Sequence, residues 1–149
     1  MDNNEYIVPF SIIKSYTQDW DNEIDLKIQA LYNLKDGWDF GGGLAPSKQV
    51  IENSLMLFHY FEKPYFEYGI TPTSTGGVKI TCKLENNFLD ITINLDLTID
   101  LTHEIGIGED YDTVYDQRGV DLLEIESQIN ELIKECHISE RYTLTNIII

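Results

Sequence analysis

Two consecutive stretches with a strict alternation of apolar and polar residues most constrain the fold of this chain. Apolar side chains occupy every second position from Val78 to Leu84, and again from Leu89 to Leu95. Since successive side chains of a strand point to opposite faces, each stretch predicts a strand with one buried and one solvated face. Glu85-Asn86-Asn87 lies between them and predicts a tight turn. We therefore expect an antiparallel hairpin.

The sheet is expected to extend a little beyond this hairpin. The alternation continues through Leu101, either as an extension of the second strand or as a third strand. Residues 105–115 are ambiguous, because Gly106 and Gly108 fit either a bulge or a loop between short strands. A short strand from Ile70 to Thr73 precedes the hairpin. The predicted sheet is therefore antiparallel and lies mainly within residues 70–105.

Three further segments have apolar residues at helical spacing and predict helices over residues 19–36, 47–62 and 119–136. The last is the clearest, because its apolar residues recur at spacings of three and four: Leu122, Ile125, Ile129, Leu132 and Cys136. A chain of 149 residues suits one domain. We expect an α+β fold, a single domain over residues 1–149 whose sheet is covered by three amphipathic helices.

The remaining segments carry weaker signals. In the glycine-rich connection between the first two helices, Trp38 and Phe40 are expected to plug the end of the core. Residues 6–13 are rich in β-forming side chains and predict an extended lead-in. Residues 143–149 are β-prone and have no charged side chain. We expect this tail to be paired, in its own sheet or across the two-fold axis of a homodimer.

Negative charge is concentrated in the second half of the chain. Between Leu84 and Ile133, thirteen carboxylates accompany a single base, Arg118, and supply most of the net charge of −16. They alternate with Ile and Leu at the periods of strands and helices, which indicates a folded acidic surface. Such a surface repels nucleic acid and anionic membranes and attracts basic proteins. The residues expected to bind a basic partner are Asp110, Asp112, Asp116, Asp121, Glu124 and Glu131.

The first functional hypothesis is a non-enzymatic acidic protein-binding module, because no segment of the sequence contains a recognisable catalytic motif. The setting expected for it is a bacterial or phage conflict system, as an inhibitor, immunity protein or antitoxin. A row of carboxylates along a helix can imitate the phosphates of a nucleic-acid strand for a basic groove. No cofactor is expected. The sequence has no signal peptide and no apolar run of about 20 residues, so a cytoplasmic location is expected.

Two alternatives remain open. The first is a metal-dependent hydrolase or nuclease-like enzyme in which Asp110, Asp112 and His103 surround a divalent ion. The acidic segment lacks the central glycine and the terminal glutamate of an EF-hand, so it would be a loose site. The second alternative is a structural subunit of a larger assembly, whose acidic surface only keeps the complex soluble.

One part of the chain resembles a known family. The segment Leu34-Lys-Asp-Gly-Trp38-Asp-Phe-Gly-Gly-Gly-Leu-Ala-Pro46-Ser47 is followed by an amphipathic helix and by Ile70-Thr-Pro72-Thr-Ser-Thr-Gly-Gly77-Val-Lys-Ile. This arrangement, over about residues 30–95, resembles small uncharacterised bacterial proteins with a GWDG-x-G-x-x-APS segment and a P-T-x-x-G-G-[IV] strand segment. The chain departs at Cys82-Lys83, where that family usually has an acid followed by tryptophan. The resemblance implies a compact α+β domain, and it supplies no catalytic residues.

Overall fold

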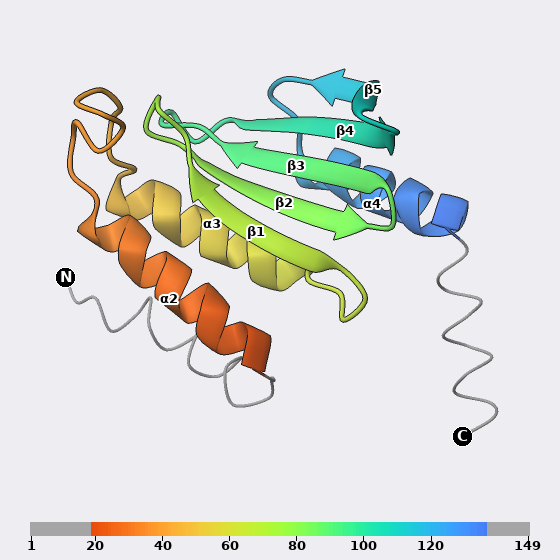
Figure 1. Ribbon diagram of the computed structural model, residues 1–149, viewed down its shortest axis with the longest axis horizontal. Helices are drawn as coiled ribbons and strands as arrows, with labels where there is room; N and C mark the ends of the chain where they lie inside the picture. The colour runs from red at the N-terminus through yellow and green to blue at the C-terminus, as the bar shows by residue number, and fades with distance from the viewer. Residues whose placement is uncertain (1–18, 137–149) are drawn as a thin grey trace.

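The computed structural model describes residues 19–136, with side chains from residue 23 on, as three helices and a five-stranded antiparallel sheet (Figure 1). The helices are α2 (Asp19–Asn33), α3 (Lys48–Phe61) and α4 (Leu122–Cys136). The strands are β1 (Glu67–Pro72), β2 (Val78–Leu84), β3 (Asn87–Ile93), β4 (Ile99–Ile107) and β5 (Asp110–Gln117). The predicted lead-in of residues 6–13 and the predicted pairing of residues 143–149 lie outside the described residues.

The strands follow one another across the sheet in the order β1-β2-β3-β4-β5. The predicted hairpin is present, with Ile80 opposite Ile91 and Leu84 opposite Asn87. In both strands every second residue is buried, as the alternation predicted. The burial of one side of each strand places the core on one face of the sheet.

The sheet is larger than predicted, and the expected extent of residues 70–105 is wrong. It begins at Glu67 and ends at Gln117, because β5 adds a strand to the far edge. Residues 97–101 did not extend β3. Instead, the Leu97 amide donates to the Asn94 carbonyl in a turn, and a separate strand begins at Ile99. β5 gave no alternation in the sequence because none of its residues is buried.

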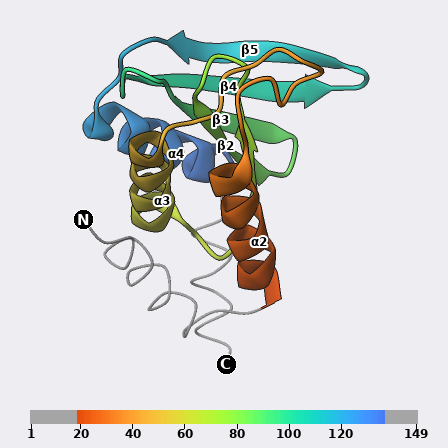
Figure 2. The same ribbon diagram turned by 90° about the vertical axis from the view of Figure 1, so that its left-hand side faces the viewer.

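The helices are not equivalent in the way they meet the sheet. Figures 1 and 2 show α3 and α4 lying across one face, whereas α2 lies alongside α3 at the β1 edge. Residues from both layers are fully buried between them, including Phe58 of α3, Leu89 of β3 and Ile129 of α4. The opposite face has no helix among the described residues and carries polar pairs. In one of them, the Thr81 hydroxyl donates a hydrogen bond to the Asp90 carboxylate at 2.6 Å.

Local hydrogen bonds determine where the helices begin and end. The hydroxyl of Ser47 accepts a hydrogen bond from the Val50 amide at 3.2 Å and caps α3. α2 ends at Asn33 rather than at residue 36, because the Leu34 amide closes a tighter turn onto Leu31. α4 begins at Leu122, three residues later than predicted, after a cap described below.

The glycine-rich connection is a braced loop, and the expectation that Phe40 plugs the core is wrong. Asp39 and Gly42 exchange two backbone hydrogen bonds of 2.9 Å, which leaves Phe40 at the tip of a tight turn. The Phe40 side chain is fully exposed, and its φ of 51° is in the left-handed region. Trp38 is half-buried, and its indole N–H donates to the Leu44 carbonyl at 2.8 Å.

Candidate functional site

The six carboxylates predicted to bind a partner come from two elements. Asp110, Asp112 and Asp116 lie on β5, whereas the other three lie on α4 or directly before it: Asp121, Glu124 and Glu131. All six are exposed. These carboxylates, up to 21 residues apart in the sequence, lie on the edge strand and on the helix that the Tyr115–Glu124 hydrogen bond joins to it. We call these six residues the acidic surface.

The carboxylates of β5 do not share one face of the sheet. Asp112 is opposite Ile105, which is on the helix-covered side, while Asp116 is opposite Thr102 on the open side. Their spacing of four residues would place both on one face of a regular strand. A β-bulge at His103/Glu104 adds one residue to β5 and reverses the side on which the later residues lie. Asp116 there accepts a hydrogen bond from Thr102 at 3.3 Å.

Two acidic residues near the start of α4 also support the fold. The Asp121 carboxylate accepts a hydrogen bond from the Glu124 amide at 2.9 Å, which is the geometry of a helix N-cap. The Glu124 carboxylate accepts one from the Tyr115 hydroxyl at 3.1 Å and joins α4 to β5. Glu131 lies two turns further along the same side of the helix, where it is exposed.

The base within this region does not neutralise the acidic surface. The Arg118 guanidinium is 3.1 Å from the Asp100 carboxylate, which lies near the start of β4. Burial opposes the ionisation of Asp100, but hydrogen bonds from Asn94, Arg118 and the Gly119 amide hold its pKa below the usual value. Arg118 therefore stabilises a turn, and its ion pair is with Asp100 and not with one of the six carboxylates of the acidic surface.

His103 lies in the core, away from where the predicted metal site would be. It is 2% exposed, and its Nε2 is 2.9 Å from Oδ1 of Asn87. Asp110 and Asp112 are exposed and lie opposite Ile107 and Ile105, further along the hairpin. Among residues 19–136, no group of three or more His, Cys, Asp or Glu side chains is placed to hold a metal ion. The geometry therefore gives no support to the hydrolase alternative.

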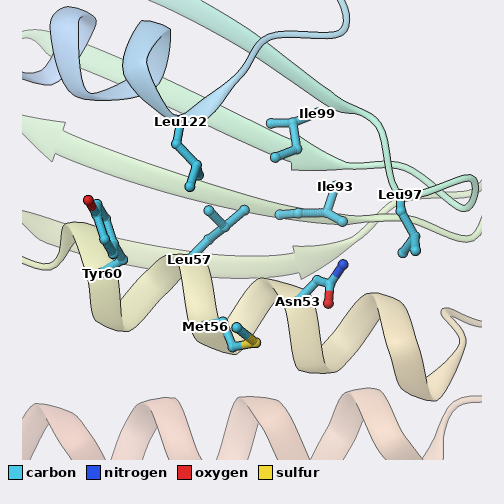
Figure 3. Close-up of a pocket in the computed structure, with 8 residues that line it drawn as sticks. All are labelled: Asn53, Met56, Leu57, Tyr60, Ile93, Leu97, Ile99 and Leu122. Atoms are coloured by element: carbon cyan, nitrogen blue, oxygen red, sulfur yellow. The ribbon is translucent and has the colours of Figure 1, made fainter.

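The structure also contains an apolar groove that sequence reasoning missed. It has a volume of about 280 Å³ and lies between α3, the β3–β4 turn and the start of α4 (Figure 3). Its lining comprises Asn53, Met56, Leu57, Tyr60, Ile93, Leu97, Ile99 and Leu122. The available signal was the presence of Met56 and Tyr60 one turn apart, outside the buried stripe of α3. We call this feature the α3–α4 groove.

The described part of the chain contains no helix that is both long enough and apolar enough to cross a bilayer. Comparisons with models of protein families, with curated proteins and with solved structures found no match to this chain.

Proposed function

We propose that this protein is a non-enzymatic binding module that presents its acidic surface to a basic protein. The biological role proposed for it is that of an inhibitor, immunity protein or antitoxin in a bacterial or phage conflict system. The supporting observation is that six exposed carboxylates, on β5, on α4 and directly before it, lie within residues 85–133, whose single base, Arg118, is paired with Asp100. Lys134 follows in the last turn of α4. Ordinary protein surfaces mix both signs of charge, whereas here carboxylates far outnumber bases.

A surface of this kind accelerates the encounter with a basic partner. Carboxylates at the sheet edge and along α4 add their fields, so a basic protein is steered toward them from a distance. Salt screens this attraction over about 8–10 Å at ionic strengths near the physiological value. Binding should therefore be fast at low salt and should weaken as salt is added.

The test compares two triple variants of equal charge. The site variant combines Asp112→Asn, Asp116→Asn and Glu131→Gln, which leaves the helix cap at Asp121 intact. The control variant combines Glu23→Gln, Asp39→Asn and Glu67→Gln, three exposed carboxylates on α2, the glycine-rich loop and β1. Each variant loses three negative charges. Both are used as bait at low salt in lysate from bacteria that carry conflict systems, and the association rate with the captured protein is then measured.

The wild type and the control variant should capture the same basic protein, with association rates that agree within about twofold. The site variant should associate at least about tenfold more slowly at low salt, and the difference should shrink at high salt. Equal rates for the two triple variants would contradict the proposal, because only total charge would then matter.

A further inference from the structure

We propose that the α3–α4 groove binds an amphipathic helix of the basic partner, with apolar anchors inside the groove and Lys or Arg side chains along its rim. This inference rests on the proposed function, because it describes a second contact made by the same partner. The groove opens between two helices, as Figure 3 shows, and side chains from α3, β3, β4 and α4 converge on it.

The lining is suited to apolar anchors. None of its eight residues, all within the described part of the chain, is charged. Met56 is 70% exposed, Tyr60 61% and Leu122 47%, so large apolar surfaces remain in water at the mouth. A cavity of about 150 Å³ holds one benzene-sized group, so the groove has room for roughly two anchor side chains. Two anchors one turn apart are what the apolar face of a helix presents.

The rim is suited to basic flanking residues. Glu126 is exposed and lies one turn after Leu122 on the same side of α4. Glu126 thus places a carboxylate beside the uncharged groove on its α4 side. An amphipathic helix with Lys or Arg beside its apolar face satisfies both the lining and the rim.

Charge also argues against two other occupants. A second copy of this chain would bring another net charge of −16 to the acidic rim. The uncharged C-terminal residues 143–149 have no basic side chain to meet Glu126. A basic amphipathic helix is therefore the occupant whose chemistry fits the whole site.

The probe is a synthetic helix of about 18 residues with Leu at positions i, i+3, i+4 and i+7 and Lys elsewhere. Its control is a peptide of the same composition with the Leu and Lys positions scrambled. The groove variant is Met56→Glu, and its matched control is Leu26→Glu on α2, where the side chain is equally exposed at 71%. Both substitutions add one negative charge, and the one at position 56 lies nearer to the bound peptide, so weaker binding of Met56→Glu reports lost apolar contact and not charge. Affinity is measured by fluorescence anisotropy, and melting temperature verifies that both variants fold.

The Met56→Glu protein should bind the amphipathic peptide at least about tenfold more weakly than the Leu26→Glu protein, and the wild type should prefer it about tenfold over the scrambled peptide. Equal affinities of the two variants would overturn the groove inference and leave the acidic surface untouched. Two other results would also overturn the groove inference. A dimer seen in sedimentation and abolished by Met56→Glu would assign the groove to a second copy of the chain. A tenfold gain in peptide affinity on deletion of residues 143–149 would assign it to the C-terminal tail. Failure of the proposed function is seen separately, in the two triple variants.

Discussion

At the scale of single residues, His103 shows how a polar side chain is accommodated in the core. Asn87 donates from Nδ2 to Sγ of Cys136 at 3.4 Å, so its Oδ1 accepts from Nε2–H of His103. The three side chains connect the middle of the sheet to the end of α4. Burial lowers the pKa of His103, against an opposing contribution from the negative charge of Glu135.

This environment predicts a pH dependence of stability. The lowered pKa means that the unfolded chain, with a histidine pKa near 6.5, binds the proton more readily than the folded protein. Stability contributed by neutral His103 is therefore present above about pH 6.5 and is lost as the pH falls below it, with a slope of at most about 1.4 kcal/mol per pH unit. Urea unfolding between pH 7.5 and 5.5 measures this loss. A His103→Gln variant is the control, and parallel curves for the two proteins would contradict the prediction.

Phe40 provides a second residue-scale prediction. Its φ of 51° is unfavourable for an aromatic residue, and its exposed ring gains no packing in return. Phe40→Gly should raise the free energy of unfolding by about 0.5–1 kcal/mol, because glycine adopts this conformation without strain. Phe40→Ala removes the ring but keeps the strain, so it should give no gain. Thermal unfolding of both variants checks this, and equal melting temperatures would show that strain is absent.

At the scale of secondary-structure elements, α4 combines structural and surface roles in one sequence. Its inner side is buried through Ile125, Ile129 and Leu132. Its outer side carries carboxylates, and the Glu124 carboxylate accepts a hydrogen bond from the Tyr115 hydroxyl. Directly before the helix, the Asp121 carboxylate accepts one from the Glu124 amide and caps the first turn. The element therefore has acidic residues whose removal affects stability and others, such as Glu131, whose removal affects only charge.

Substitutions at Asp121 separate these roles. Asp121→Ala removes the acceptor for the Glu124 amide and should lower the free energy of unfolding by about 1 kcal/mol. Asp121→Asn removes the charge but keeps a capping oxygen, so it should lie within about 0.5 kcal/mol of the wild type. Denaturant titration of both variants is the measurement. A similar loss in both would mean that charge at the helix N-terminus, and not the cap, stabilises α4.

At the scale of the whole molecule, self-repulsion opposes folding. A net charge of −16 on 149 residues destabilises the compact state, and much of it is concentrated on one half of the chain. The melting temperature should therefore rise when NaCl is increased from about 20 mM to about 300 mM, as the Debye length shortens. The site variant with Asp112→Asn, Asp116→Asn and Glu131→Gln should show a smaller rise. A melting temperature that is independent of salt would contradict this.

The sequence by itself determined the β2–β3 hairpin and the inner face of α4. In these elements one side is buried by neighbours and the other is in water, so apolar and polar residues recur at the period of the strand or helix. The concentration of carboxylates after Leu84 was likewise visible without a structure, because charge is a property of composition.

Only the tertiary structure decided where β5 ends the sheet, on which face each of its aspartates lies, and that Phe40 is in solvent. An edge strand with no buried residue has no hydrophobic period to detect, and a bulge changes the face of Asp116 without changing the residues around it. The α3–α4 groove likewise depends on side chains from Asn53 to Leu122, which folding alone brings together. Local periodicity reports only which side of an element is buried, whereas a site built from several elements depends on how they pack.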